Sequence, residues 1–193
     1  MRKATAADKQ LVSEILVSAF SPLEESSAIN LVVKQDKKRI KRMLILMEYL
    51  FETAMLFGEI YISDNNKACL LLKYPLNEKV TLKTIGLDIK LAFKCIGLER
   101  VFGVLKRQRI TKKHAPKEHY IRPMILGSKN DSIGKGTAAR LMMEVRLKFK
   151  DNKLPVITDA ASEDNAKMYQ KFGFRITKTD ESLGFPIYFL RLN

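Results

Sequence analysis

The chain has 193 residues, of which 46% are hydrophobic, and its 35 basic residues against 21 acidic ones give a formal net charge of +14. A chain of this length can bury roughly 70% of its unfolded surface, so one domain with a sizeable core is expected. No apolar run reaches the roughly 20 residues that span a bilayer, and Met1-Arg2-Lys3 leads into no signal-peptide core. We therefore expect a soluble, cytoplasmic protein with no membrane partner.

Cys69 and Cys95 are the only cysteines, and His114 and His119 are the only histidines. The cysteines do not form a Cys-x-x-Cys pair, and the four side chains together lack the spacing of a metal site. We expect no metal and two reduced thiols that are mostly buried, as free cysteines commonly are.

The positive charge is concentrated in two stretches, 34–42 and 106–114. A basic field favours anionic ligands and is typical of nucleic-acid-binding proteins. Neither stretch is interleaved with the aromatic side chains that stack bases in single-strand binders. Three interpretations stay open, in this order of preference: a solvated helix face, attraction of an anionic cofactor or substrate, and nucleic-acid binding.

Hydrophobic periodicity and turn residues predict strands and helices along the whole chain. In chain order they are a strand at 2–5, a helix at 6–19, one or two helices at 27–56, strands at 58–63 and 67–74, two short helices within 80–110, a strand at 119–127, a helix at 134–151, a strand at 155–160, a helix at 163–172, and strands at 174–179 and 185–192. Gly86, Gly97 and Gly103 are expected to interrupt the helices of 80–110. The pattern favours a mixed α/β (α+β) fold with one layer of sheet and helices on both faces.

A glycine-rich turn lies between the strand at 119–127 and the following helix. Gly134, Gly136 and Ala138 alternate there, so backbone amides are exposed with no side chain in the way. The first amides of a helix lack intrahelical partners, and the helix dipole adds partial positive charge, so a phosphate is well received. Lys135 adds a full positive charge. A Gly-x-Gly on its own is also common in plain turns.

A second stretch, 162–174, follows a short strand-like run. Ser162 is typical of a helix start and Gly173 of a helix end. Asn165 and Tyr169 are four residues apart, which places them on one helical face.

Together these two stretches resemble the GNAT superfamily of N-acetyltransferases. Ile133, Gly136 and Ala138 stand at the places of its pyrophosphate-binding motif, which is Gln or Arg, two residues, Gly, one residue, then Gly or Ala. Residues 165–174 resemble its later motif, in which an Asn precedes a Tyr that is followed shortly by Gly-Phe.

Two further stretches agree with this resemblance. Residues 2–8 are similar to the family's first strand and the start of its first helix, which usually ends in Ala-Phe, as the chain has at Phe20. The stretch 114–118, His-Ala-Pro-Lys-Glu, resembles the branch that contains puromycin N-acetyltransferase.

The resemblance implies a single domain over 1–193 with the GNAT acyl-CoA N-acyltransferase fold, a mixed central sheet of about six to seven strands with helices on both faces. It places a helical insertion at about 80–113, between the third and fourth strands, where such a segment can close over the acceptor site. The implied activity is direct transfer of the acetyl group of acetyl-CoA to a primary amine of a small molecule, without a covalent enzyme intermediate. Acetyl-CoA is then the cofactor, and the protein is a monomer or homodimer.

The residues expected to bind the cofactor are Leu126, Ser128, Ile133, Gly134, Lys135, Gly136, Thr137, Ala138, Ala139 and Asn165. The amides of 134–139 would hold the pyrophosphate. Backbone groups of Leu126 and Ser128 would pair with the pantetheine arm, and Asn165 would either hold that arm or cap local backbone.

Acetyl transfer also needs a proton for the departing thiolate and a neutral amine. Tyr169 matches the family's tyrosine beside the thiol, and a phenol with an ordinary pKa near 10 is protonated at pH 7 and can act as the general acid. The alternative is that its ring packs under the final strands. Glu118 and His119 are the first candidates for the base, acting through water, and Glu59, which begins the second strand, is a third. Each is more often a surface or structural residue, and a water chain could replace all of them.

The sequence also departs from the family pattern. Ile133 stands where Gln or Arg is usual, which favours an alternative function as a CoA or acyl-CoA sensor with weak catalysis. A nucleic-acid-associated basic protein is a further alternative. Pro123 lies within the strand at 119–127 and cannot donate a ladder hydrogen bond, so a bulge or an unpaired position is expected there.

Overall fold

The computed structural model describes residues 1–22 and 28–193. Residue 27, the first of the helical segment predicted at 27–56, lies outside the described residues. Among the described residues, no helix is long and apolar enough to cross a bilayer.

The first sheet has four strands in the order β1 (Arg2–Lys3), β2 (Gly58–Ile62), β3 (Ala68–Lys73) and β4 (Arg122–Ser128), each antiparallel to its neighbour. A tight turn joins β2 to β3, and Asn66 takes a positive φ of 54° there, a conformation that asparagine tolerates better than most residues. The predicted hairpin is therefore confirmed.

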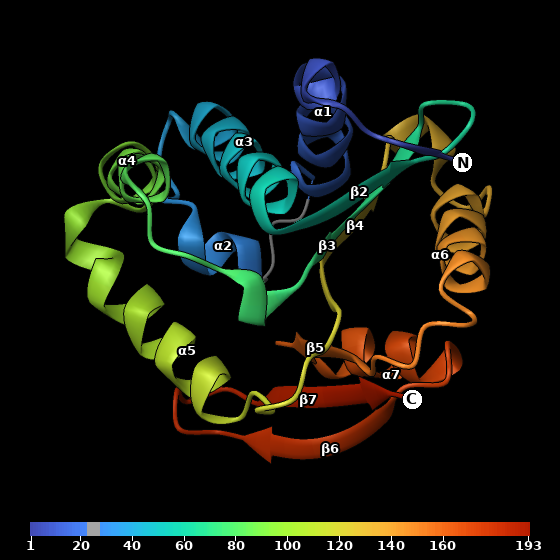
Figure 1. The fold of residues 1–193 in the computed structure, drawn as a ribbon. Coiled ribbons are helices and arrows are strands. Elements are labelled where there is room, and N and C mark those ends of the chain that lie inside the picture. The colour runs from blue at the N-terminus through green and yellow to red at the C-terminus, as the bar shows by residue number, and fades with distance from the viewer. Residues whose placement is uncertain (23–27) are drawn as a thin grey trace.

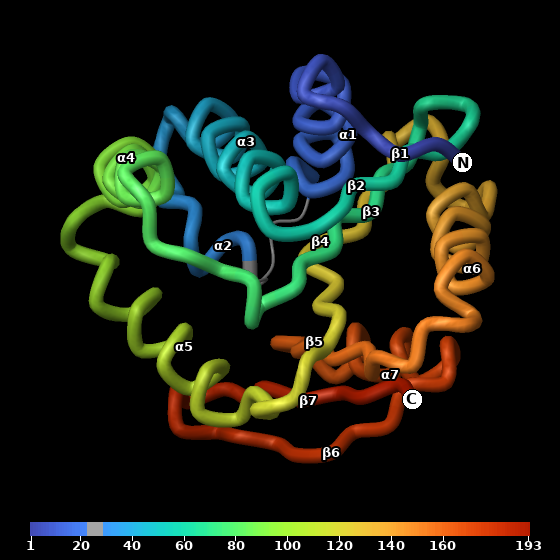
Figure 2. Tube along the Cα trace, in the orientation of Figure 1, coloured from blue at the N-terminus to red at the C-terminus, as the bar shows by residue number. Residues whose placement is uncertain are grey.

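The second sheet has three antiparallel strands in the order β5 (Val156–Ala160), β7 (Ile187–Leu192) and β6 (Arg175–Asp180). A single parallel bridge, Ile121 to Val156, joins the two sheets at the beginning of β4 and β5. Beyond this bridge the two strands separate, as the tube in Figure 2 shows. The predicted single layer of sheet is thus divided into two parts, because β4 and β5 pair at one end only.

Strands β2 and β3 are buried on both faces. Ile60, Ile62, Cys69 and Leu71 face the cluster under α1 (Lys9–Phe20) and α3 (Arg39–Phe57). The alternate residues Tyr61, Leu70 and Leu72 pack with Leu141 and Val145 of α6 (Thr137–Lys148). A strand pair covered on both faces reads in sequence as a nearly continuous apolar run, as Ala68 to Leu72 does.

The remaining helices lie around the two sheets (Figure 1). They are α2 (Ala28–Val32), α4 (Leu82–Leu91), α5 (Val101–Lys113) and α7 (Glu163–Lys171). Helix α7 packs on the second sheet around Ala160, Ala166, Phe174 and Leu190. Helices α4 and α5 lie between β3 and β4 in the chain, as the predicted helical insertion does.

Two details of the predicted insertion are wrong. Gly86 and Gly103 lie inside α4 and α5, and only Gly97, with φ +84°, separates the two helical parts. A glycine within a helix costs about 0.5–1 kcal/mol relative to alanine, which neighbouring turns readily offset, whereas a positive φ favours glycine strongly. The bulge expected near Pro123 is confirmed, because the register between β3 and β4 shifts there: Leu71 pairs with Ile125 and Leu72 with Pro123.

Candidate functional site

The glycine-rich turn forms an open cradle of backbone amides at the start of α6. Gly134 and Gly136 have φ values of +76° and +69°, and a Cβ added at either would meet no atom within 4 Å. In the described part of the chain, no backbone acceptor pairs with the amides of Gly134, Gly136 and Thr137 to Ala139, and the Arg140 amide is the first to bond back, to the Gly136 carbonyl at 2.8 Å. These five amides are available to an anion.

Two of the predicted cradle amides are already used within the turn. The Ile133 amide donates to the Asn130 carbonyl at 3.2 Å, and the Lys135 amide donates to the Ser132 carbonyl at 3.2 Å. Ile133 leaves its apolar side chain 66% exposed beside the cradle. Lys135 can contribute through its ammonium group, and Ile133 offers only apolar contact.

A cavity of about 370 Å³ adjoins the cradle, between the β2–β3 turn and the start of α6. It is lined by Lys135 and Thr137, which the sequence indicated, and also by Lys67 and Arg140, which it did not. Lys67 is paired with Asp131 at 2.8 Å, while Lys135 and Arg140 have no carboxylate partner among the described residues. Arg140 lies on the first turn of α6, so a basic residue three or four positions after a cradle glycine is the signal that could have found it.

Leu126 and Ser128 lie on the part of β4 that leads into the cradle. On one side they pair with Leu70 and Ala68 of β3. On the other side, within the described residues, the ladder to β5 is limited to two hydrogen bonds at Ile121. The Ile121 amide donates to the Pro155 carbonyl at 3.0 Å, and the Ile121 carbonyl accepts from the Ile157 amide at 2.9 Å. The edge of β4 that faces β5 is therefore open to an extended, hydrogen-bonding ligand.

Tyr169 and Asn165 both lie on α7, as the sequence predicted, but in different surroundings. The Tyr169 ring packs against Phe174 with centroids 5.3 Å apart. Burial raises the pKa of its phenol above the ordinary value, and a hydrogen bond with the Thr158 side chain opposes part of that shift. The Asn165 side chain is exposed, and its backbone amide donates to the Ser162 hydroxyl at 3.3 Å, which caps the helix.

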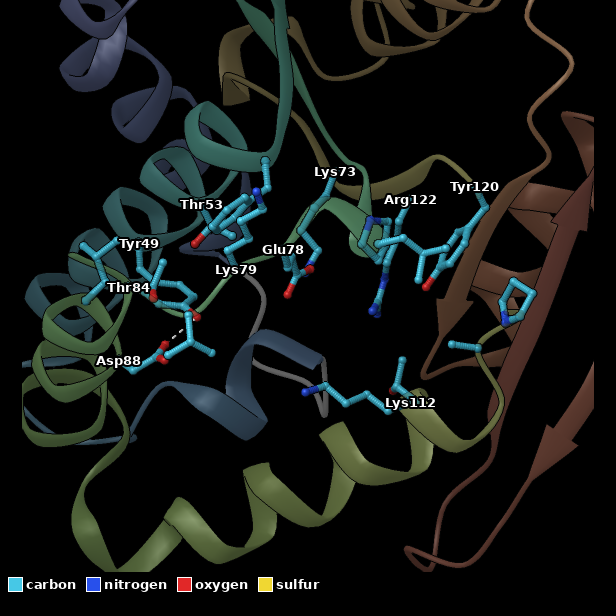
Figure 3. Close-up of a pocket in the computed structure, with 18 residues that line it drawn as sticks. Tyr49, Thr53, Lys73, Glu78, Lys79, Thr84, Asp88, Lys112, Tyr120 and Arg122 are labelled. Atoms are coloured by element: carbon cyan, nitrogen blue, oxygen red, sulfur yellow. Dashed lines mark hydrogen bonds and ion pairs between the residues drawn. The ribbon is translucent and has the colours of Figure 1, made fainter. Parts of the chain in front are cut away.

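A second, larger cavity, of about 460 Å³, lies among α3, α4, α5 and the ends of β3 and β4. Figure 3 shows Tyr49, Thr84 and Asp88 at one end and Tyr120 and Arg122 at the other. The Tyr49 hydroxyl donates to Asp88 at 2.8 Å.

A crevice of about 10 Å³ adjoins the large cavity, and Tyr169, which lines neither of them, is linked to the crevice through Thr158. Tyr120 and Arg122 line both the large cavity and this crevice, which also includes Thr158. Thr158 is the hydrogen-bond partner of Tyr169. The phenol is thus next to the end of the cavity at which β4 and β5 begin to separate.

A buried ion cluster fixes that end of the cavity. Asp159, whose side chain is 6% exposed, accepts hydrogen bonds from Arg122 and from Arg107 of α5, the latter at 2.8 Å. One carboxylate therefore ties the insertion to both sheets.

The three predicted bases lie away from these cavities, and Glu59, on β2, pairs with Lys3 at 3.4 Å. Glu118 is half exposed and pairs with Arg191 at 2.6 Å, and His119 is exposed. Neither lines any of the cavities described above. The structure brings together the cradle, the open edge of β4 and, near the large cavity, Tyr169, but it does not bring Glu118 and His119 to them.

His114 was not singled out as a catalytic group from the sequence, yet it lines the same crevice as Thr158. Its side chain is 7% exposed, its Nε2 lies 2.8 Å from Asp180 Oδ2, and its ring packs edge-on against Phe189 at 4.8 Å. An ionised carboxylate only accepts, so this hydrogen bond places a proton on Nε2 and leaves Nδ1 as an acceptor in the neutral ring. Asp180 is 66 residues away in the chain, and no local spacing could have indicated the pair.

The two sheets that diverge from one bridge, with a glycine cradle at the start of the helix after β4, define the fold of the GNAT acetyltransferases. No family model matches the sequence, and no curated protein matches it. Solved structures do match along nearly the whole chain. The C-terminal condensation domain of Ebony in complex with beta-alanyl-dopamine has a TM-score of 0.68 at 11% identity, covering 99% of this chain and 96% of that chain.

Two other solved structures carry the same fold. Arylalkylamine N-acetyltransferase 2 from Aedes aegypti has a TM-score of 0.63 at 15% identity, covering 99% of this chain and 96% of its own. A GNAT family acetyltransferase from Brucella melitensis in complex with acetyl-CoA has a TM-score of 0.53 at 11% identity, covering 99% of this chain and 84% of its own. At these identities the likeness establishes the fold, and the activity has to be argued from the site.

Proposed function

We propose that the protein is an N-acetyltransferase that transfers the acetyl group of acetyl-CoA directly to the primary amine of a small molecule. The observation that carries this proposal is the set of five unpaired amides at the start of α6, which continues the open edge of β4. A diphosphate joined to an extended, amide-containing arm matches that combination of groups. We also propose that residues 1–193 form a single domain, in which 80–113 is an insertion over the acceptor.

The described residues fit acetyl-CoA. The cradle amides would bind the pyrophosphate, with Lys135 and Arg140 neutralising its charge, and Leu126 and Ser128 would pair with the amides of the pantetheine arm. A bound acetyl-CoA supplies an activated acetyl group with a thiolate leaving group. Asn165 would offer its exposed side-chain amide to the same arm.

Tyr169 is the proposed general acid. Its raised pKa keeps the phenol protonated at neutral pH, so the hydroxyl can donate a proton to the departing sulfur. The hydrogen bond to Thr158 and the packing against Phe174 hold the ring in one orientation.

For the base, we infer that His114 is better placed than Glu118 or His119. His114 lines the crevice that adjoins the acceptor cavity, whereas Glu118 is held by Arg191 on the surface. Asp180 orients the imidazole through Nε2, which leaves Nδ1 to take a proton from the amine, directly or through water.

The neighbouring structures support the class of acceptor. One is an arylalkylamine N-acetyltransferase, and another is in complex with acetyl-CoA. A volume of about 460 Å³ suits a small molecule, and the lining combines apolar side chains with charged ones, among them Asp88 and Arg122.

The test is isothermal titration of the protein with acetyl-CoA, followed by thiol-release assays on a panel of amines. Gly136→Trp should abolish binding, because the indole would occupy the cradle. Gly184→Trp is the matched control: Gly184 also has a positive φ, +82°, and no atom within 4 Å of an added Cβ, but it lies in the turn between β6 and β7. Absence of binding by the unchanged protein, or equal loss in both variants, would refute the proposal.

A sensor that binds CoA without turnover is the second candidate, favoured by the exposed Ile133 beside the cradle. The same experiments separate the two functions. Tight binding of acetyl-CoA that depends on Gly136, together with no acetylation of any amine in the panel, would favour the sensor.

A further inference from the structure

The helical insertion exposes an unusual set of large apolar side chains. Leu82 is 90% exposed, Phe93 61% and Phe102 83%. On α4 the exposed residues recur at intervals of three or four, which places them along one side of the helix. The full set, which we call the insertion face, is Leu82, Ile85, Ile89, Phe93, Leu98, Phe102 and Leu105.

The two phenylalanines lie on either side of the turn at Gly97. Phe93 ends the α4 part, and Leu98 and Phe102 begin the α5 part, so three exposed apolar residues lie within ten positions of one corner. Figure 1 shows α4 and α5 at the edge of the molecule opposite α6. Monomeric proteins rarely leave so many neighbouring large apolar side chains in water without a partner.

The charge of the same segment is strongly positive. Residues 79–113 contain ten basic and two acidic residues, so they carry a net +8 of the chain's +14. Both acidic groups have partners: Asp88 accepts a hydrogen bond from Tyr49, and Glu99 forms a salt bridge with Lys34. The exposed Lys94, Lys106, Arg109 and Lys113 have no carboxylate partner in the described residues, and thus border the insertion face with free positive charge.

We propose that the insertion face binds the surface of an anionic lipid bilayer. Phenylalanine and leucine side chains beside free lysines and arginines are the composition by which amphipathic helices lie in the interface of a membrane, apolar groups among the acyl chains and cations at the anionic headgroups. This proposal departs from the expectation of no membrane partner. That expectation considered only segments long enough to span a bilayer, and binding at the surface needs none.

This charge pattern argues against the other anionic partner. A nucleic acid would engage the cations but would leave the aliphatic side chains of Leu82, Ile85 and Ile89 in water. These side chains also do not stack on bases as aromatic platforms do. A bilayer uses both halves of the face.

The location gives the contact a geometric consequence. The opposite side of the same two helices lines the large cavity, through Thr84, Leu87, Asp88 and Thr111. A bilayer on the insertion face would therefore lie one helix away from the cavity. Binding to the bilayer does not depend on acetyl transfer.

The test is co-sedimentation of the full chain with vesicles of equal parts phosphatidylglycerol and phosphatidylcholine, compared with vesicles of phosphatidylcholine alone. The protein should bind only the anionic vesicles. The double variant Phe93→Ser/Phe102→Ser should bind at least about tenfold more weakly, because its apolar anchors are removed. Lys106→Gln and Arg109→Gln should each weaken binding about fivefold, with a smaller loss at high salt.

The matched control is Met143→Ser/Leu147→Ser on α6, where the two side chains are 60% and 70% exposed. It removes similar apolar surface away from the insertion face and should leave vesicle binding unchanged. All replaced side chains are exposed, so circular dichroism should show folded variants.

Three results would overturn the proposal. The first is no binding of the unchanged protein to anionic vesicles. The second is an equal loss in the α6 control. The third is that the protein does not bind vesicles but either associates with itself, measured by ultracentrifugation, or binds duplex DNA, measured by titration. In that case the Phe93→Ser/Phe102→Ser variant would abolish the self-association or the DNA binding.

Discussion

Replacing Tyr169 by phenylalanine removes one oxygen atom and leaves the ring. The packing of this ring against Phe174, with centroids 5.3 Å apart, should remain, and the lost hydrogen bond to Thr158 should lower the free energy of unfolding by about 1 kcal/mol. If the phenol donates a proton to the leaving thiolate, its loss should lower kcat by about 10²- to 10⁴-fold. Binding of acetyl-CoA should stay within about twofold, since no cradle group changes.

The direction of the Tyr169 pKa shift predicts the pH dependence as well. Burial raises this pKa, so the protonated form that acts as an acid persists to higher pH and is lost only as the pH rises through the raised value. The rate should therefore show no alkaline decline due to Tyr169 below about pH 10, the ordinary pKa of tyrosine.

The assay is release of the CoA thiol with the best amine of the panel, beside calorimetry with acetyl-CoA. Tyr188→Phe is the control, because Tyr188, on β7, packs against the same hydrophobic cluster of α7 and the second sheet as Tyr169 does. An unchanged kcat in Tyr169→Phe, or an equal fall in both variants, would remove Tyr169 from the mechanism.

Three further predictions concern stability and reactivity. Asp159→Asn should lower the free energy of unfolding by about 3–5 kcal/mol in urea titrations, because two arginines lose their buried counter-charge. Asp151→Asn, at an exposed position, is the control and should change little. Similar unfolding midpoints for the two variants would contradict this prediction. Gly58→Ala should destabilise the protein by about 2–3 kcal/mol, since a Cβ there would lie 2.0 Å from the Leu72 carbonyl oxygen. Gly103→Ala should stabilise it by about 0.5–1 kcal/mol, because a Cβ at this helical position meets no atom within 4 Å. Thermal melts that rank the two variants in the opposite order would refute this prediction. Burial raises the pKa of both cysteine thiols, so neither should react with an aromatic disulfide until the protein unfolds, and one equivalent of fast reaction in the folded state would show that a thiol is accessible.

Most elements could be predicted from the sequence because their signals are local. The alternation of Gly58 to Ser63, the turn at 64–66 and the returning apolar run predicted the hairpin, and Pro123 predicted the irregularity in β4. The two internal glycines of the insertion were misjudged. A glycine only lowers the stability of a helix, and tertiary packing decides whether the helix continues.

The candidate site divides in the same way. The cradle lies within one short stretch, where chain geometry alone sets the direction of the amides, so its glycines were found from the sequence. The large cavity, which we propose as the acceptor site, is built from several separate segments, and the pairing of His114 with Asp180 joins residues 66 positions apart.

The sequence by itself determined the strands, the helices, the cradle and the helical spacing of Asn165 and Tyr169, because each depends on residues a few positions apart. Only the tertiary structure decided that β4 and β5 separate beyond Ile121 and that His114, rather than Glu118 or His119, lines the crevice beside the large cavity. It also decided that the apolar side chains of the insertion remain in water, since burial depends on which elements pack together, and the same helical pattern fits a buried or an exposed face equally well.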